Sequence, residues 1–498
     1  MMQRTQEGLL PPPTLQRSNL CPGIPLRVHF LGAGGAGVSG AARVLHDHGH
    51  VLSGHDRAES RHVELLREMD VNVEVCPQAA AQLPEGVQLV VRSAAISSDD
   101  PQLRDASERG IPVLKYSELL GRITPPGRTL AVAGTHGKTT SSWLTFHALR
   151  GVAEAMDQPR PGAIIGGICG KLGKNAVTAE PSGLFVVEAC EYDRSFLKIN
   201  PQCAIITNVE DDHLDYFGTS DEIHKAFSQF AHRVHPEGLL VLGKDVPRTI
   251  ENSARCKVWR LGHELHAELV SERLGRFTMR LRGPGFEISE IALGVPGQFN
   301  VDNAALALGL AIGSSMRAWP ADLARTVHAA ARGVERFGGA KRRFESWGSS
   351  GGVELVHDYA HHPTEVRVTI EAAQRVFAGR PLHVLFQPHQ HSRTSRFLAE
   401  FVESLRSAHR VVIADVYGAR NHIDGANSAT ATDIANGLAS CKVSAFAPGD
   451  KANSARVFAA GLPDNGVGLV LGAGDIEDVQ DELLAHLALR RTVASTAR

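Results

Sequence analysis

Residues 131–142 read AVAGTHGKTTSS, which predicts an apolar strand, a glycine-rich turn and the first turn of a helix. Small apolar residues lead into a glycine-containing turn, and Lys138 and Thr139 follow where a helix would begin. Backbone N–H groups in such a turn bind phosphate oxygens, while the helix N-terminus, a lysine and a threonine-bound Mg²⁺ neutralise their charge. The strict pattern would place its first glycine where Val132 stands. We predict a nucleoside triphosphate site, with a plain strand-to-helix turn as the alternative.

The composition indicates a multidomain globular protein. At 498 residues the chain is too long for one hydrophobic core, and its length predicts about three domains. A formal charge of −2 predicts no general affinity for nucleic acid. Seven cysteines without a C-x-x-C pair favour reduced thiols, and no apolar run has the length of a membrane span. Residues 1–23 lack the apolar core of a signal peptide, and we expect a flexible tail there.

A first α/β segment opens with a glycine fingerprint. Residues 24–40 read IPLRVHFLGAGGAGVSG, a strand that runs into Gly32, Gly34 and Gly37, and a second strand ends at Asp56. This is the G-x-G-x-x-G pattern with an acidic residue at the expected distance. The pattern fits NAD, but it fits any other diphosphate equally well, and glycine is also needed for close helix packing.

A second segment begins at Thr129 and adds polar residues after two further apolar strands. The first of these strands ends at Glu188. The second is followed by Asn208, Asp211, Asp212, His213 and Asp215. Parallel strands end at the same sheet edge as the phosphate loop, so Glu188 and His213 are candidates for holding a metal beside the γ-phosphate. A solvated loop acid and a surface imidazole are the alternatives.

A third α/β segment follows residue 333. Its strand-like runs each end in Asp, His, Arg or Gly, which indicates a second ligand-facing sheet edge. Taken singly, Arg342 and Arg343 suit a surface basic pair, and His361 and His362 suit a helix N-terminus. The histidines of 45–50 lack a partner at metal-ligand spacing and predict a helix end.

Together and in this order, the motifs make the chain resemble the Mur ligase family over about residues 25–480. The stretches that carry the resemblance are VHFLGAGGAGVSG (28–40), GTHGKTT (134–140), TNVEDDHLDYF (207–217), PGQFNVDNAALAL (296–308), RRFE (342–345), HDYAHHPTEV (357–366), FQPHQHSRT (386–394) and GAGDI (472–476).

The resemblance implies an α/β fold of three domains. They are an N-terminal Rossmann-like domain for a UDP-sugar (24–128), a central P-loop ATPase-type domain with a mostly parallel sheet (129–334) and a C-terminal Rossmann-like domain (335–498). It implies an ATP-dependent ligase of the bacterial cytoplasm that joins L-alanine to the lactyl carboxylate of UDP-N-acetylmuramate through an acyl phosphate. ATP is then a co-substrate and Mg²⁺ or Mn²⁺ the metal. The partners are small molecules, and the oligomeric state stays open.

The resemblance also assigns roles to residues. The catalytic residues would be Lys138, Glu188, His213 and Arg343. ATP would be bound by Gly134, Thr135, His136, Gly137, Lys138, Thr139, Thr140, Asn300, Asn303, Arg343 and Asp358. The UDP-sugar would be bound by Gly32, Gly34, Gly35, Gly37, Asp56 and Ser93. The amino acid would be bound by Tyr359, His361, His389 and Arg393. The metal ligands would be Thr139, Glu188 and His213.

The chain departs from the family pattern at Cys190 and His357, where acids are common, and at Gln390, where some members have Arg. Which of Glu188 and Glu191 binds metal also stays open. Outside this reading, a nucleotide-switched binding protein would use the same loop, and an NAD oxidoreductase would rest on the first glycine fingerprint. Within the family, a recycling ligase that attaches a tripeptide is the alternative.

Overall fold

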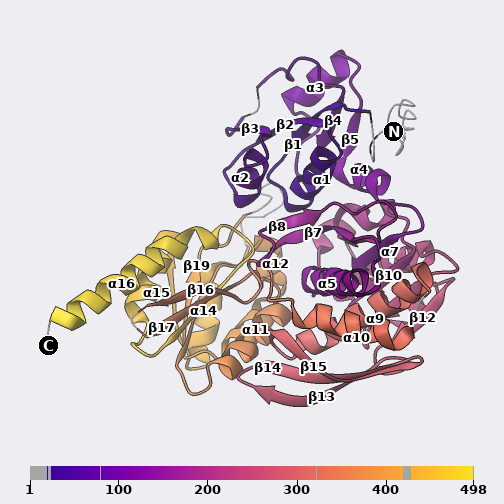
Figure 1. The fold of residues 1–498 in the computed structure, drawn as a ribbon. Coiled ribbons are helices and arrows are strands. Elements are labelled where there is room, and N and C mark those ends of the chain that lie inside the picture. The colour runs from indigo at the N-terminus through magenta and orange to yellow at the C-terminus, as the bar shows by residue number, and fades with distance from the viewer. Residues whose placement is uncertain are drawn as a thin grey trace. The chain divides into compact units, whose positions relative to one another are not determined.

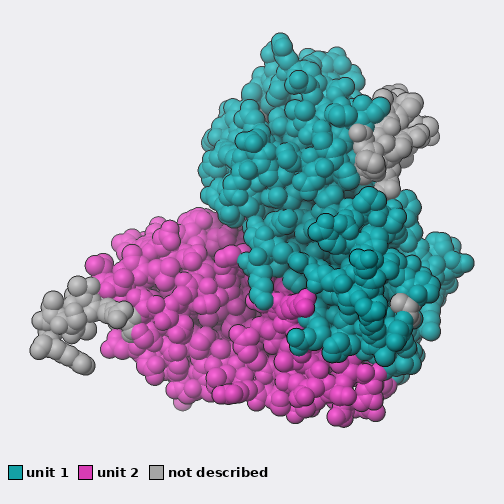
Figure 2. All heavy atoms as spheres, in the orientation of Figure 1, with its two compact units in different colours: residues 1–265, 283–286, 306–334 teal, residues 266–282, 287–305, 335–498 magenta. Residues whose placement is uncertain are grey.

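The computed structural model describes residue 20 and residues 24–78, 80–320, 322–350, 352–418 and 428–496, with only the backbone considered at 215 and 490–496. The chain divides into two compact units (Figure 2). The first unit comprises residues 1–265, 283–286 and 306–334, and the second comprises residues 266–282, 287–305 and 335–498. The tail expected over 1–23 lies outside the described residues except for Leu20. Leu20 is buried, and its carbonyl lies 3.1 Å from His50 Nε2.

The N-terminal part of the first unit is a parallel sheet in the order β3-β2-β1-β4-β5 (Figure 1). Its elements are β1 (Arg27–Leu31), α1 (Ala36–Asp47), β2 (Val51–Asp56), α2 (Arg61–Arg67), β3 (Asn72–Val75), β4 (Leu89–Arg92), α3 (Pro101–Glu108), β5 (Val113–Lys115) and α4 (Tyr116–Ile123). The strand order reverses at β1, so the glycine loop after β1 opens at the switch point, where doubly wound sheets bind ligands.

The central sheet of the first unit has the order β12-β11-β10-β6-β9-β7-β8. Its elements are β6 (Thr129–Ala133), α5 (Lys138–Met156), β7 (Gly162–Cys169), β8 (Lys174–Val177), β9 (Phe185–Glu188), η3 (Tyr192–Lys198), β10 (Cys203–Ile206), α6 (Leu214–Phe217), α7 (Ser220–Arg233), β11 (Leu239–Leu242), α8 (Arg248–Glu251) and β12 (Lys257–Arg260). The neighbours of β6 are parallel to it, with Val132 opposite Glu188 and Ala133 opposite Ile206. The loops after β6, β9 and β10 therefore leave the sheet at one edge.

An antiparallel sheet that the sequence analysis did not predict follows the central sheet. It consists of β13 (His266–Arg273), β14 (Arg276–Gly283) and β15 (Phe286–Pro296), and α9 (Phe299–Ala318) and α10 (Leu323–Glu335) come next. The alternation along β14, with Phe277, Met279 and Leu281 buried, is the period of a strand with one covered face.

The C-terminal sheet of the second unit has the order β16-β17-β21-β18-β19-β20, and only its β16–β17 pair is antiparallel. Its elements are β16 (Glu345–Ser350), β17 (Val353–Asp358), α11 (Pro363–Val376), β18 (Leu382–Phe386), α12 (His391–Arg396), α13 (Leu398–Leu405), β19 (Arg410–Ala414), α14 (Ala431–Ser440), β20 (Ser444–Gly449), α15 (Lys451–Gly461), β21 (Val467–Leu471), η4 (Ile476–Val479) and α16 (Gln480–Thr496). Hydrophobic clusters cover both faces of this sheet, as a parallel sheet requires.

The mostly parallel sheets with their helices confirm the α/β prediction. The two compact units are a different division of the chain, and the predicted domain boundaries stay predictions. Within the described ranges, no helix combines the length and the apolar composition needed to cross a membrane.

Candidate active site

The phosphate loop connects β6 to α5 and depends on glycine. Gly137 is the N-cap residue of α5 at a φ of 81°, and Gly134 has a φ of 133°. A Cβ at Gly134 would clash with the hydroxyl of Thr207, so the loop closes only on a residue without a side chain. Thr135 and Thr140 of the same loop are buried. The N-terminus of a long helix and a turn of this shape form an anion site.

The side chain of Lys138 folds back over its own loop. Its Nζ donates to the carbonyls of Gly134 (2.6 Å) and Thr135 (2.9 Å) and to Glu191 Oε1 (3.0 Å). Burial is the largest single effect and lowers the pKa of Lys138, but the surrounding negative charges, led by the carboxylate of Glu191, together outweigh it and hold that pKa above its usual range. The three N–H bonds of the ammonium group thus all have acceptors within the protein.

Glu191 is a site residue that the sequence analysis left undecided. Its side chain is 4% exposed, and its Oε2 is buried without a hydrogen-bond partner among the described residues. His213 Nε2 lies 3.9 Å from Glu191 Oε1 and 3.8 Å from Asp212 Oδ2. The structure therefore groups Glu191 with Lys138 and His213. The only sequence signal for this was a second acid three residues after the end of β9.

Glu188 occupies the end of β9 and meets the first turn of α5. Its Oε1 accepts from the Thr139 hydroxyl at 3.0 Å, and its Oε2 accepts from the backbone N–H of Gly166 at 2.7 Å. The register of β6 and β9 explains the meeting, because Glu188 stands opposite Val132 just before the phosphate loop. A hydroxyl and a carboxylate at this distance are oxygen donors of the kind Mg²⁺ prefers, so the predicted pair of Thr139 and Glu188 fits this metal.

The loop after β10 fastens the phosphate loop from the other side. Asn208 Oδ1 accepts from the N–H of His136 at 2.8 Å, and the N–H of Thr135 donates to the Asn208 carbonyl at 3.1 Å. His136 Nε2 lies 3.5 Å from Glu210 Oε2. Of the polar residues expected at the ends of these strands, Glu188 and Asn208 thus contact the phosphate loop or the first turn of α5, and the side chain of Asp215 lies outside the described residues.

The N-terminal glycine loop is built for close approach as well. The backbone N–H of Gly34 donates to Asp56 Oδ2 at 2.7 Å, while Asp56 Oδ1 accepts from the N–H of Arg57 at 2.7 Å. A Cβ at Gly32 would press on Ser93. Asp56 and Ser93 therefore flank the loop, and the Asp56 carboxylate is engaged in holding it.

Two further glycines of this loop sit at the start of α1. Gly35 is its N-cap residue, and a Cβ at Gly37 would press into the ring of Tyr116. Tyr116 begins α4 and is a contact that the sequence analysis missed. Burial, followed by the negative charge of Glu188, raises its pKa beyond the usual range.

In the second unit, Asp358 ends β17 and organises the turn that carries Arg343. Its Oδ2 accepts from the N–H of Phe344 at 2.7 Å, and its Oδ1 accepts from the N–H of Ala360 at 2.8 Å. Burial raises the pKa of Asp358 to about 6, against the opposing charge of Arg343. The guanidinium carbon of Arg343 lies 5.0 Å from the centroid of the Tyr359 ring.

The four residues predicted to bind an amino acid form one continuous cluster. The rings of Tyr359 and His361 are 5.2 Å apart, those of His361 and His389 are 5.7 Å apart, and Arg393 Nη1 lies 3.2 Å from His389 Nδ1. Arg393 is buried. Tyr417, which stacks on His389 at 5.6 Å, belongs to the same cluster and was not predicted.

The asparagines of α9 are buried at its first turn. Asn300 Nδ2 donates to the Pro296 carbonyl at 2.6 Å, and Asn303 Nδ2 donates to Asn300 Oδ1 at 3.0 Å. These two hydrogen bonds fix both asparagine side chains at the first turn of α9.

The departures from the family pattern have different surroundings. Cys190 is exposed. His357 is buried against Trp347 at 4.6 Å between ring centroids, and burial lowers its pKa to about 3, so the imidazole is neutral. Gln390 is the N-cap residue of α12 at a φ of 71°.

Comparison with protein-family models finds three matches in order along the chain. They are the Mur ligase family, catalytic domain, over residues 27–125, the Mur ligase middle domain over 132–311 and the Mur ligase, glutamate ligase domain over 342–474. These spans confirm the three-domain architecture.

Curated relatives match over nearly their whole length. The UDP-N-acetylmuramate–L-alanine ligase of Rubrobacter xylanophilus is 37% identical over 93% of this chain and 100% of its own, and that of Kineococcus radiotolerans is 38% identical over 93% and 97%. Among solved structures, UDP-N-acetylmuramate-alanine ligase MurC from Thermotoga maritima superposes with a TM-score of 0.75 at 24% identity, covering 94% of this chain and 100% of that one. The chain belongs to the Mur ligase family and is an ATP-dependent ligase of peptidoglycan precursor synthesis.

Proposed function

We propose that the chain joins L-alanine to the lactyl carboxylate of UDP-N-acetylmuramate in the bacterial cytoplasm, with release of ADP and phosphate. The observation that carries the proposal is the full-length match to relatives named for this reaction, at 36–38% identity. The site geometry supports this reaction. The phosphate loop follows a strand of one mostly parallel sheet, and the cluster of histidine and arginine side chains follows strands of another.

We assign the UDP diphosphate to the N-terminal glycine loop. The N–H group of Gly37 at the start of α1 suits a diphosphate, whereas the N–H groups of Gly32 and Gly35 shape the loop by donating to the carbonyls of His55 and Gly32. Asp56 positions this loop through its bond from Gly34. Ser93, beside Gly32, is assigned to the same substrate.

ATP is assigned to the phosphate loop. The loop residues Gly134 to Thr140 surround the phosphates in this proposal, and Lys138 exchanges its carbonyl acceptors for phosphate oxygens. Thr139, Glu188 and His213 are the proposed ligands of Mg²⁺, which supplies charge neutralisation when bound. Further ATP contacts are assigned to Asn300, Asn303, Arg343 and Asp358.

The chemistry has two steps that the assigned residues can support. A carboxylate oxygen of the sugar nucleotide attacks the γ-phosphorus, the bond to ADP breaks, and an acyl phosphate forms. The neutral amine of L-alanine then attacks the acyl carbon, the carbon–oxygen bond to phosphate breaks, and a proton leaves the nitrogen. Two anions must meet in the first step, so the cationic charges of Lys138 and Arg343 would supply most of the rate enhancement.

The amino acid is assigned to the cluster of Tyr359, His361, His389 and Arg393. A guanidinium group can bind a carboxylate through two parallel hydrogen bonds, which suits Arg393 to the carboxylate of L-alanine.

ADP release, measured against a matrix of UDP-sugars and amino acids, tests the proposal. We expect turnover only with UDP-N-acetylmuramate, and with L-alanine as the preferred co-substrate. Turnover with the tripeptide L-alanyl-γ-D-glutamyl-diaminopimelate in place of L-alanine would assign the chain to the recycling reaction instead.

A further inference from the structure

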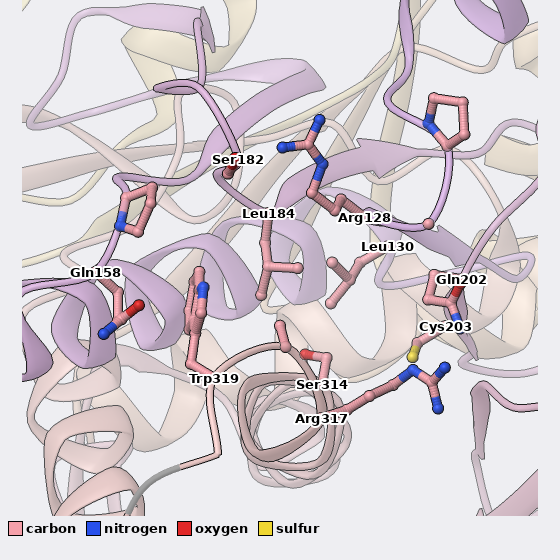
Figure 3. A pocket seen from close by; sticks show the side chains of 14 residues that line it. Arg128, Leu130, Gln158, Ser182, Leu184, Gln202, Cys203, Ser314, Arg317 and Trp319 are labelled. Carbon is pink, nitrogen blue, oxygen red and sulfur yellow. The ribbon is translucent and has the colours of Figure 1, made fainter.

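A cavity of about 810 Å³ lies in the first unit (Figure 3). Its lining includes Arg128 just before β6, Leu184 just before β9 and Cys203 at the start of β10. The same strands end at the phosphate loop, at Glu188 and before Asn208. Because these strands are parallel, the cavity and the ATP site occupy opposite ends of the same three strands.

The lining of this cavity is cationic. Arg128 and Arg317 contribute guanidinium groups, and no Asp or Glu is among the described lining residues. Arg317 is paired with Glu237 at 3.1 Å, and its Nε donates to the Gln202 amide oxygen at 3.1 Å when that amide is oriented to satisfy both groups. Arg128 is half-buried, and no ion pair to it is found in the described part of the chain. The guanidinium group of Arg128 is therefore the charge that is available to bind an anion.

The remaining wall is apolar and includes a flat ring. In Figure 3 the side chains of Leu130 and Leu184 lie between the indole of Trp319 and the guanidinium group of Arg317. Arg317 lies at the end of α9, and Trp319 is the residue after this helix. Leu130 lies at the start of β6, and Leu184 comes just before β9. A cavity of this volume has room for a whole small molecule, and an indole beside leucine side chains accepts a planar ring.

We propose that this cavity is a second small-molecule site that binds an anion carrying a planar ring, of the nucleoside monophosphate class. The anion pairs with Arg128, and the ring lies on Trp319 and Leu184. This site is distinct from the phosphate loop and does not depend on the proposed ligase reaction.

The chain offers a local reporter for this site, because Trp319 is one of four tryptophans and Trp143, Trp259 and Trp347 are buried. We would label the full chain with 5-fluorotryptophan, assign the Trp319 ¹⁹F resonance with Trp319→Phe, and titrate UMP and AMP. We expect a saturable shift of this resonance with a Kd of about 1 mM or tighter. Inorganic phosphate alone and uridine alone should each bind at least about tenfold more weakly, because each lacks one half of the recognised group.

Two variants separate specific binding from a general charge effect. Arg128→Gln should weaken UMP binding about tenfold or more, and the other tryptophan resonances report that it is folded. Arg150→Gln removes the same charge from the surface of the central domain, where Arg150 pairs with Glu154, and should leave the affinity unchanged. A Trp319 resonance that does not move with either nucleotide would overturn the proposal. Equal affinity in Arg128→Gln, or equal affinity for phosphate, would overturn it too.

Discussion

At the scale of single residues, the ammonium group of Lys138 is bound to protein acceptors that it must leave before it can contact ATP. Its ammonium group donates to two loop carbonyls and to the buried carboxylate of Glu191. In the proposed complex, phosphate oxygens take over as acceptors. Glu191 then competes with the nucleotide for the lysine and also places negative charge beside the triphosphate.

Removing the amine tests whether Lys138 screens the charge of the phosphates. Lys138→Ala should lower kcat about a thousandfold or more, because the charge on the transferring phosphoryl group is left unscreened. Binding of UDP-N-acetylmuramate, measured by calorimetry, should stay within a factor of about two, because that site is assigned to another domain. A variant that loses sugar affinity and keeps its rate would contradict the domain assignment.

Removing the carboxylate of Glu191 tests whether this group competes with ATP for Lys138. Glu191→Gln should tighten the Kd for metal-free ATP about tenfold, or about 1.4 kcal/mol, because the neutral amide no longer holds the lysine by charge. ATP binding in the presence of a chelator measures this without the metal. Glu222→Gln is the matched control, since it neutralises an exposed carboxylate of the same domain. Unchanged or weaker ATP binding in Glu191→Gln would refute the competition.

At the scale of elements, the strand–loop–helix unit of β6 and α5 depends on Gly134. Gly134→Ala should weaken ATP binding more than about a hundredfold, because the added methyl group collides with Thr207 and the loop must open. Gly49→Ala is the control, since Gly49 also has a positive φ of 86° but no atom lies within 4 Å of its Cβ position. It should cost about 1–2 kcal/mol of stability and leave ATP affinity unchanged. ATP binding by Gly134→Ala within threefold of the parent would count against the clash.

The helix α7 bears on whether a carbamylated lysine supplies negative charge to the site. Family members that add later amino acids carry a carbamylated lysine about fourteen residues after the histidine of their DHLD motif, and that spacing leads here to Phe227. Phe227 is fully buried, whereas Lys225 is 63% exposed and pairs with Glu222 at 3.5 Å. Lys225 is therefore a solvent-exposed side chain, and the residue at the family's spacing is a phenylalanine, which cannot be carbamylated.

Lys225→Ala should therefore keep its turnover, with or without added bicarbonate. A loss of more than about a hundredfold, or about 2.7 kcal/mol in the barrier, would show a carbamate at Lys225 if a short-chain carboxylic acid restored the activity.

The elements also show where sequence reasoning succeeds. Apolar runs that end in Glu188 or before His213 were readable because a parallel strand is buried on both faces. The β13–β15 sheet was missed although β14 alternates, and the β7–β8 hairpin was missed because its apolar residues do not alternate. The pairing of Glu191 with Lys138 could not be predicted, since it depends on how the chain turns after β9 over 53 residues of separation.

At the scale of the whole molecule, buried histidines set the response to acid. Burial lowers the pKa of His29, His147 and His383 to about 4 and that of His357 to about 3. Each binds a proton in the unfolded chain below about pH 6.5 but not in the folded one, so the stability they contribute is present above pH 6.5 and is lost as the pH falls toward 4. Asp358, with its pKa raised to about 6, acts in the opposite sense and stabilises the fold more as the pH falls through 6.

Four histidines outweigh Asp358 and Glu477, whose pKa burial also raises, so the urea midpoint of the full chain should fall between pH 7 and pH 5. Each histidine can contribute up to about 1.4 kcal/mol per pH unit. His357→Gln should flatten this dependence, whereas replacing exposed His263 should not. A midpoint that is constant over this range would contradict the neutral, buried state of these imidazoles.

Activation of the carboxylate of the sugar nucleotide by the γ-phosphate of ATP is the key step of the proposed reaction. Its most direct measurement uses UDP-N-acetylmuramate labelled with ¹⁸O in the lactyl carboxylate, together with ATP and L-alanine. The oxygen that attacks the phosphorus leaves with phosphate when the amide forms, so ¹⁸O should appear in the released inorganic phosphate, alongside ADP. Recovery of ¹⁸O in AMP, with pyrophosphate as the second product, would contradict it.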